Sequence, residues 1–393
     1  MNLRAIQAAL CDAKLDGWLF YDHHRRDPIA YRVLKIAPVM CTRRWYYLIP
    51  AAGEPSKLVH RIEKGNLAGL PGAEFEYSSW QEQRGHLKKV LEGKKRVAMQ
   101  YSPLNDIPYV GLVDAGTIEL VRSCGVEVIS SGDLVQLFEA RWSPEALKSH
   151  LEAGVIVHQI VRDAFAMIRE AVKSGKGIGE YDVQQEMARL FEANGLEADE
   201  PPNVSVNANS ANPHYSPTPA SSRPIRASDF VLLDVWAKKK VPGSVYFDIT
   251  WTGYVGAEVP RKYAEVFEVV RNARDAAFRL VRRALENHRA LHGYEVDDAA
   301  RMVIARQGYG DYFVHRTGHS IGEDVHGNGA NMDNFETHDA RQIIPGTCFS
   351  IEPGVYLPEF GVRSEVDVYV DEDDARITGE VQQEIVPILA GNS

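Results

Sequence analysis

The sequence predicts a two-domain protein whose first domain belongs to the α/β class, and three observations support this. The chain has 393 residues, more than a single hydrophobic core ordinarily organises. Up to about residue 142, short apolar runs alternate with helix-like segments. A strong helix start follows, because Ser143 can cap a helix whose first residue is Pro144. We therefore predict an α/β domain over residues 1–142 and a second domain over residues 143–393.

In the first domain, residues 3–15 have the apolar spacing of an amphipathic helix. Short apolar runs predict strands, and they cover residues 17–21, 45–50, 96–99 and 126–129. The polar stretch 22–27 contains two histidines, but it directly follows a predicted strand. A solvated loop explains it better than a binding site.

In the second domain, we predict helices over residues 143–168, 179–194, 263–287 and 296–306. Residues 203–224 are rich in Asn, Ser and Pro and predict a long loop without regular structure, which contains His214. A loop of this length is either functional or disordered, and the sequence favours neither alternative.

Composition excludes several classes of protein. Apolar residues make up 45% and charged residues 25%, and the formal net charge is −10. Such an acidic surface repels phosphate backbones, and the basic cluster Lys238–Lys240 precedes a Val-Pro-Gly turn, so we predict no nucleic-acid partner. No apolar run is long enough to cross a membrane, and the charged N-terminal segment does not resemble a signal peptide. Four scattered cysteines suit reduced thiols, and we predict a cytoplasmic protein.

The strongest functional signal is a set of four carboxylates inside apolar strands. Residues 230–236 predict a strand that contains Asp234, and residues 245–251 predict its hairpin partner with Asp248. A third strand, 348–351, runs into Glu352. The fourth, 361–370, alternates with a period of two. That alternation places four polar residues on one face, namely Arg363, Glu365, Asp367 and Tyr369.

Buried carboxylates need a counter-charge. Burying one without a partner costs several kcal/mol, and four together repel one another. Any one of them could instead be solvated or ion-paired at a strand end, but this alternative weakens for four in one half of the chain. Two divalent cations would balance four carboxylates, and metal pairs about 3.5–4 Å apart serve hydrolytic enzymes.

Histidines strengthen the metal prediction. His315, His319 and His326 lie in a glycine-punctuated stretch ahead of the two glutamate strands. Neutral imidazole combined with carboxylates suits Mn, Co, Zn or Fe. His338 precedes a turn, and we predict that it is a surface residue.

These motifs, in this order, resemble those of a known family. Asp, Asp, His-x-x-Gly-His, Ile-Glu-Pro-Gly and Val-Arg-x-Glu are similar to the motifs of the pita-bread metallopeptidases, which include methionine aminopeptidase, aminopeptidase P, prolidase and creatinase. The resemblance covers residues 143–393 and is closest to prolidase, the Xaa-Pro dipeptidase. It implies an α+β pita-bread catalytic domain preceded by the creatinase/prolidase-like α/β domain.

The resemblance also implies roles for individual residues. Asp234 would bind one metal, Asp248 and Glu365 would bridge both, and His319 and Glu352 would bind the second. Glu352 would also move the proton of the nucleophile. Four residues would contact the substrate, and two of these, His214 and His326, would act at the scissile group; the four are His214, His315, His326 and Arg363. The implied reaction is hydrolysis of the bond before proline in Xaa-Pro dipeptides or short peptides, through a hydroxide bridging two Mn, Co or Zn ions. A homodimer is implied as well.

Two alternatives stay open. One is a creatinase-like amidinohydrolase, and the other is a non-catalytic pita-bread binding protein. The chain keeps all five ligand positions, which counts against both. It departs from proline-specific relatives in that the two aspartates lie fourteen positions apart, Tyr246 is displaced, and Trp251 stands where those relatives have arginine. We expect these departures to alter substrate preference rather than metal binding.

Overall fold

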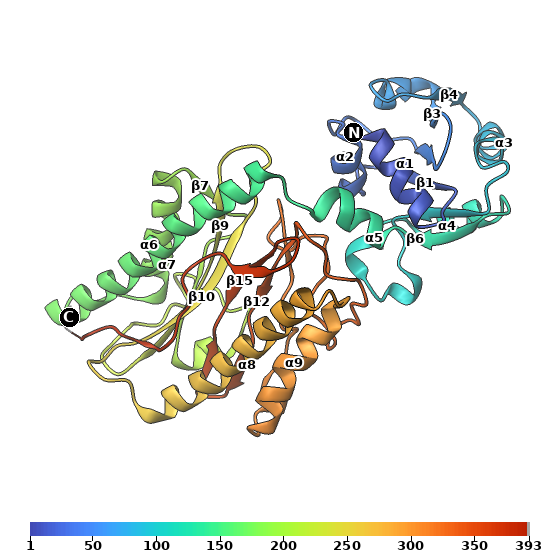
Figure 1. Cartoon of the computed structure of the whole chain (residues 1–393). Helices are drawn as coiled ribbons and strands as arrows, with labels where there is room; N and C mark the ends of the chain where they lie inside the picture. The colour runs from blue at the N-terminus through green and yellow to red at the C-terminus, as the bar shows by residue number, and fades with distance from the viewer. Residues whose placement is uncertain (391–393) are drawn as a thin grey trace. The chain divides into compact units, whose positions relative to one another are not determined.

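The computed structural model of the protein describes residues 1–390. The chain forms two compact units, Met1–Glu139 and Ala140–Ser393 (Figure 1). The boundary predicted between residues 142 and 143 lies close to this division. Each unit is described by itself.

The first unit has the predicted α/β class, with one mixed six-stranded sheet in the order β4-β3-β2-β1-β5-β6. Its strands are β1 (Gly17–Asp22), β2 (Trp45–Pro50), β3 (Ser56–His60), β4 (Ala73–Tyr77), β5 (Arg96–Met99) and β6 (Glu127–Ser130). Its helices are α1 (Leu3–Asp12), α2 (Pro28–Leu34), α3 (Trp80–Val90), α4 (Ala115–Arg122) and α5 (Gly132–Val135). Strands β3 and β4 were not predicted, because charged residues interrupt their apolar pattern.

The second unit contains four long helices and three small sheets. The helices are α6 (Pro144–Ser174), α7 (Glu180–Ala193), α8 (Arg261–Glu286) and α9 (Gly293–Arg306). One sheet has the order β17-β10-β9-β7 with β8 also paired to β9, the second β11-β12-β15-β16, and the third is the hairpin β13-β14. The strands are β7 (Leu196–Glu197), β8 (Asn203–Val206), β9 (Phe230–Lys239), β10 (Phe247–Tyr254), β11 (Ser320–Ile321), β12 (Cys348–Ile351), β13 (Gly354–Leu357), β14 (Phe360–Arg363), β15 (Val366–Val370), β16 (Ala375–Ile377) and β17 (Val386–Pro387).

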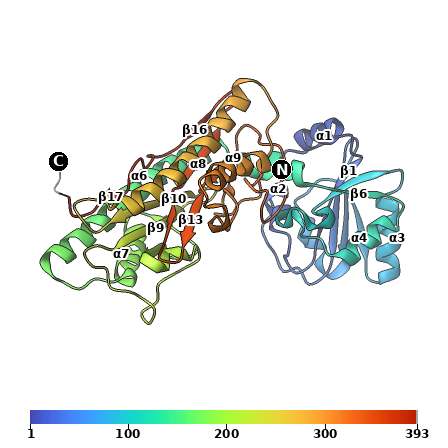
Figure 2. The ribbon, with the colours of Figure 1, turned by 90° about the horizontal axis from the view of Figure 1, so that it is seen from below.

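Helices cover the outer faces of these sheets, as Figures 1 and 2 show. Helix α6 begins as predicted, because Ser143 Oγ accepts a hydrogen bond from the Ala146 N–H (3.1 Å). Helices α6 and α7 pack on β9, β10 and β8, while α8 packs on α9 and on β12, β13 and β14. The α6–β10 approach is close: a Cβ on Gly154 would lie 2.6 Å from the Phe247 ring. This arrangement leaves the inner faces of the sheets turned toward each other.

The side chains of β10 lie alternately in two environments. Phe247 and Ile249 join the hydrophobic core beneath α6. Asp248 and Thr250 point the opposite way, toward β15 and the Arg363–Glu365 stretch. The period of two in this strand therefore delivers polar groups to the space between the sheets, which is the interior of the predicted pita-bread fold.

Two predictions of local structure were wrong. Residues 203–224 are not structureless throughout, because β8 pairs with β9, with Asn203 opposite Asp234, and a 3-10 helix (Asn207–Ala211) follows. The predicted strand 361–370 is two strands, since β14 pairs with β13 whereas β15 pairs with β12. Ser364 lies at the break and accepts a hydrogen bond at Oγ from the buried Arg274 of α8 (2.7 Å).

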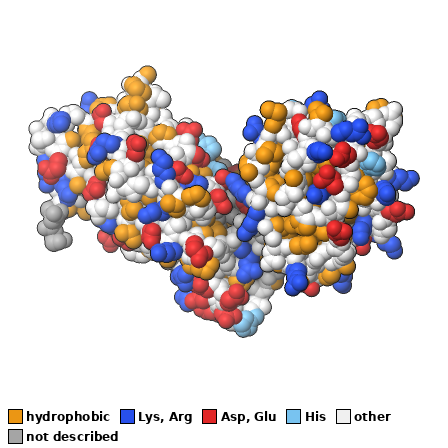
Figure 3. Space-filling model, turned by 90° about the horizontal axis from the view of Figure 1, so that it is seen from above, with side chains coloured by type: hydrophobic (Ala, Val, Ile, Leu, Met, Phe, Trp, Pro, Cys, Tyr) orange, Lys and Arg blue, Asp and Glu red, His pale blue; other side chains and the backbone are white. Residues whose placement is uncertain are grey.

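Among residues 1–390, no helix combines the length and the apolar character that a membrane crossing requires. On the face drawn in Figure 3, acidic and basic side chains are intermixed.

Candidate metal centre

Three predicted ligands meet between the sheets of the second unit. Asp248 comes from β10, His319 from the segment before β11, and Glu365 from the break between β14 and β15. One potential ligand atom from each lies within 4.8 Å of the other two. Their exposed fractions are 5%, 4% and 3%. Two carboxylates and an imidazole converging in a buried space form a suitable donor set for a divalent cation.

Asp234 joins this cluster through Thr250. The two residues are paired across β9 and β10, so their side chains share the inner face. Thr250 Oγ1 donates a hydrogen bond to Glu365 Oε2 (2.7 Å), lies 3.4 Å from Asp234 Oδ1, and accepts from Arg363 Nε (2.7 Å). The Arg363 guanidinium also forms an ion pair with Asp234 Oδ2. Thr250 thus lies beside two predicted ligands, and Arg363 contacts both Thr250 and Asp234.

Glu352 and Asp248 approach the same nitrogen of His319. His319 Nε2 is 3.4 Å from Glu352 Oε1 and 3.5 Å from Asp248 Oδ2. His319 Nδ1 lies 3.2 Å from the Ser320 carbonyl. That contact fixes the tautomer with the proton on Nδ1 and leaves Nε2 as the ligand atom.

Backbone contacts hold the His319 and Glu352 segments together. The Glu352 N–H donates to the Thr317 carbonyl (2.7 Å), and Ser350 Oγ accepts from the His319 N–H (3.0 Å). Only glycine fits at position 318, since a Cβ there would lie 1.9 Å from the Ser350 carbonyl oxygen. The glycine of the His-x-x-Gly-His motif therefore permits the close approach of two ligand-bearing segments.

The electrostatics of the protein alone are unfavourable. Desolvation first, and then neighbouring carboxylates, raise the pKa of Asp248 and of Glu365 well above their ordinary values. Desolvation raises the pKa of Glu352 to about 7. Desolvation also lowers the pKa of His319, so its ring is neutral. Neutral imidazole and crowded carboxylates are the state that bound cations would stabilise, and the residues present fit a metal centre.

The predicted substrate residues surround this cluster, but less tightly. The ring centroid of His326 lies 4.4 Å from that of His319. His315 Nε2 is 2.7 Å from the Tyr356 hydroxyl. The pKa of His326 is lowered, by desolvation in the first place and also by the charge of Arg316. His214 is exposed on the loop that follows β8. His338 is exposed, as predicted.

Trp251 does not contact the candidate site, contrary to our expectation. Its side chain points to the α6 face of β10, where its ring meets His158 at 5.8 Å. There it lines a recess of about 280 Å³ with Phe165 and Ile388. The physical reason is the strand alternation, because Trp251 is an odd number of residues from Asp248. The displaced Tyr246 is buried, with its ring under the Lys238 ammonium (5.0 Å).

Sequence reasoning missed two residues of the site. Thr250 is two positions after Asp248, so the same period of two could have identified it. Tyr356, the partner of His315, lies in β13. No sequence signal connects this tyrosine to a histidine 41 positions away.

Comparisons with known proteins agree with this geometry. The model of metallopeptidase family M24 matches residues 148–372. A probable dipeptidase PepE of Mycobacterium tuberculosis is 27% identical over 347 residues, covering 87% of this chain and 84% of the relative. An Xaa-Pro dipeptidase of Pyrococcus horikoshii is 28% identical over 304 residues, covering 76% and 77%. The crystal structure of dipeptidase PepE from Mycobacterium ulcerans superposes with a TM-score of 0.73 at 23% identity, covering 98% of this chain and 96% of that one. The chain therefore belongs to metallopeptidase family M24.

Proposed function

We propose that this metallopeptidase hydrolyses the peptide bond before proline in Xaa-Pro dipeptides or short peptides, using two divalent cations. The observation that carries the proposal is the buried group of Asp248, His319 and Glu365, with Asp234 and Glu352 beside it. Two proteins to which this chain is similar are a probable dipeptidase and an Xaa-Pro dipeptidase. Mn, Co and Zn all suit the donor set.

Five residues would hold the cations, namely Asp234, Asp248, His319, Glu352 and Glu365. Bound there, two cations would supply Lewis acidity and a hydroxide nucleophile near neutral pH. Glu352 is well placed to carry the proton, because its side chain is 13% exposed whereas that of Asp248 is 6% exposed. The side chain of Asp234 is also 13% exposed, but it is held in the closer ion pair with Arg363. It would take the proton of the attacking water and return it to the leaving nitrogen.

The remaining residues would bind and orient the peptide. His326, beside His319, is suited to stabilise the negative charge that develops on the substrate carbonyl, and His214 would act near the same group. On the other side, Arg363 and the His315–Tyr356 pair would form the pocket beyond the scissile bond. For an Xaa-Pro substrate the leaving nitrogen carries no N–H, so this pocket must accept the proline ring.

The test is hydrolysis of Xaa-Pro dipeptides by full-length protein that has been stripped with a chelator and reloaded with Mn, Co or Zn. Metal-dependent release of proline, lost in Asp248→Ala, supports the proposal. Cleavage only of dipeptides without proline would replace the Xaa-Pro assignment. Metal binding without any cleavage of Xaa-Pro peptides would indicate that the pocket takes another substrate, and hydrolysis of creatine would test the creatinase-like alternative. Absence of metal binding leads to the non-catalytic one.

Two further predictions accompany this function. We infer a cytoplasmic location, supported by the four cysteines, all of them free. We also infer a homodimer with no nucleic-acid or membrane partner. The homodimer rests on the family resemblance alone.

A further inference from the structure

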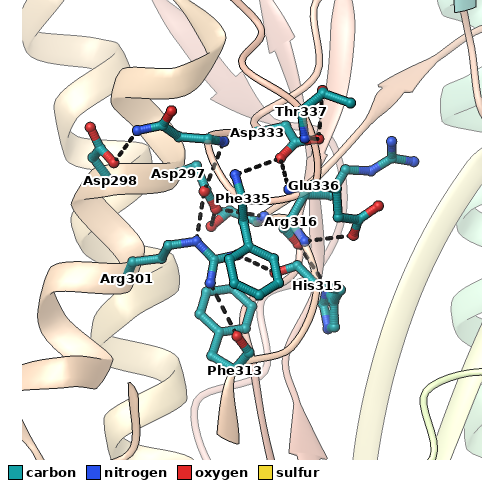
Figure 4. A network of polar contacts seen from close by, with 12 residues as sticks. Asp297, Asp298, Arg301, Phe313, His315, Arg316, Asp333, Phe335, Glu336 and Thr337 are labelled. Carbon is teal, nitrogen blue, oxygen red and sulfur yellow. Dashed lines mark hydrogen bonds and ion pairs between the residues drawn. The ribbon is translucent and has the colours of Figure 1, made fainter. Parts of the chain in front are cut away.

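The segment that carries the predicted metal ligand His319 is held on one side by side chains rather than by a strand or helix. Residues 313–317 form no regular element, yet their backbone groups are bonded. Arg301 Nη1 donates to the Phe313 carbonyl (3.1 Å), and its Nη2 donates to the His315 carbonyl. The Arg316 N–H donates to Glu336 Oε1 (2.9 Å). This network is drawn in Figure 4.

Asp297 is the centre of that network. It is fully buried on α9 and accepts four hydrogen bonds. Its Oδ1 accepts from the Thr317 N–H (2.9 Å) and from Thr317 Oγ1 (2.6 Å). Its Oδ2 accepts from Arg301 Nε (2.7 Å) and from the Asn334 N–H (2.9 Å). Only a carboxylate offers both oxygens as acceptors here, because an asparagine would turn an NH₂ group toward two of the donors.

Thr317 transmits this contact to the metal centre. Its N–H and hydroxyl are bonded to Asp297, and its carbonyl accepts from the Glu352 N–H (2.7 Å). Two residues further on, His319 continues into β11. Asp297 is therefore one bonded residue away from the backbone of Glu352, and its partner Thr317 is two positions from His319 along the chain.

Two aromatic rings pack on the arginine of the network. The Arg301 guanidinium lies between two rings, 4.2 Å from the centroid of Phe313 and 4.1 Å from that of Phe335. Asp333 bonds the N–H groups of residues 335, 336 and 337, which fixes the loop that carries Phe335 and Glu336. Because Asp297 is fully buried, its charge-assisted hydrogen bonds are strong, and they restrict where Thr317 can lie.

We propose that Asp297 is a positioning residue for the metal centre, acting through Thr317 on His319 and Glu352. Groups outside the coordination sphere orient ligands in this way, and their loss typically weakens metal binding by about 10–100-fold. The inference rests on the proposed two-metal function, and Asp297 itself touches neither the cations nor the peptide.

The test measures the affinity of chelator-treated full-length protein for Mn²⁺ by calorimetry. Asp297→Asn and Thr317→Val should each weaken binding by about 10-fold. The Mn²⁺ affinity of the double variant should equal that of the more affected single variant, because both substitutions act on the same Asp297–Thr317 contact. Thr317→Ser keeps the hydroxyl and should keep the affinity. Asp298→Asn is the matched control, since exposed Asp298 is the next residue of α9 and bonds the side chain of Asn334 in the same loop (2.8 Å).

Thermal unfolding of each variant separates positioning from general stability. Equal Mn²⁺ affinities for Asp297→Asn and Asp298→Asn, with only the Tm lowered in the former, would overturn the proposal. So would fully additive losses in the double variant. If Asp297→Asn does not fold, the Thr317→Val and Thr317→Ser pair decides the question. Wild-type protein that binds Mn²⁺ but cleaves no Xaa-Pro peptide would refute the proposed substrate and leave this comparison intact.

Discussion

The candidate metal cluster and the two loop histidines proposed to act on the substrate are built in different ways. Asp248 and Glu365 are buried on or beside strands, and their neighbours are fixed by ladder pairing. His214 and His326 lie on loops and are exposed. The contrast teaches that strands hold the carboxylates that need exact spacing, while loops hold the two histidines proposed to act at the scissile group. Variants of the first kind should abolish metal binding, and variants of the second should change kinetics at constant metal content.

The largest effect is expected from Asp248→Ala. Removing a ligand atom from the buried cluster should lower the metal content and reduce kcat/KM by about 1,000-fold or more. Metal analysis by mass spectrometry and dipeptide hydrolysis measure the two quantities. The exposed Asp374 is a suitable control, and Asp374→Ala should keep both. Full metal content in Asp248→Ala would contradict the assignment of this cluster.

The contribution of Glu352 to the free energy of unfolding should change with pH in opposite directions in the metal-free and the metal-bound protein. In the metal-free protein the pKa of Glu352 is raised from its ordinary value of 4.5 to about 7, so the native state binds more protons than the unfolded one across that range. The contribution of Glu352 to the free energy of unfolding should therefore fall as pH rises from about 4.5 to about 7, by on the order of 3 kcal/mol. The buried histidines His150, His315 and His319 have lowered pKa values and contribute in the opposite direction, so the Glu352 contribution is read as the difference between the wild type and Glu352→Gln. With metal bound, acidification should destabilise instead, because protons compete with the cations.

Denaturant unfolding at several pH values, in chelator and in excess Mn²⁺, measures both slopes. The raised pKa values of Asp248 and Glu365 add to the metal-free trend in the same direction. If the difference in unfolding free energy between metal-free wild type and metal-free Glu352→Gln does not change between pH 4.5 and 7, Glu352 is not crowded in the way described.

A smaller effect is expected from His326→Ala. This change removes a ring beside His319 without removing a ligand, so metal content should stay constant while kcat falls by about 100-fold. Steady-state kinetics together with metal analysis test this. His338→Ala, at another exposed histidine, should change neither quantity. Loss of metal in His326→Ala would move His326 into the ligand group and erase the contrast between the two regions.

The smallest effect belongs to Trp251→Phe. Because Trp251 lies on the α6 face of β10, KM and kcat for an Xaa-Pro dipeptide should stay within about 2-fold of the wild type. Any change should be in Tm, from altered packing against His158. A large change in substrate preference would show that packing on the α6 face of β10 affects the candidate site on its other face.

The burial and convergence of the carboxylates could be predicted in part from the sequence, because a carboxylate inside an apolar strand is too costly to bury unless a counter-charge balances it. Asp248 and Glu365 were found by this argument, and Ser143 located the start of α6. Residues whose role depends on distant contacts could not be found, and neither Tyr356 nor Asp297 carries a local pattern that links it to its partner. The break between β14 and β15 was missed because the two strands together keep an alternating sequence across two different sheets.

The α6 face of β10 offers a place to attach a label away from the candidate metal centre. The recess lined by Phe165, Trp251 and Ile388 lies on the opposite face of β10 from Asp248, and none of the predicted ligands lines it. A fluorescent reporter or an immobilising tether attached at the rim of this recess, for example at Arg162 of α6, would be anchored to the rigid frame of the enzyme while leaving the peptide's path free.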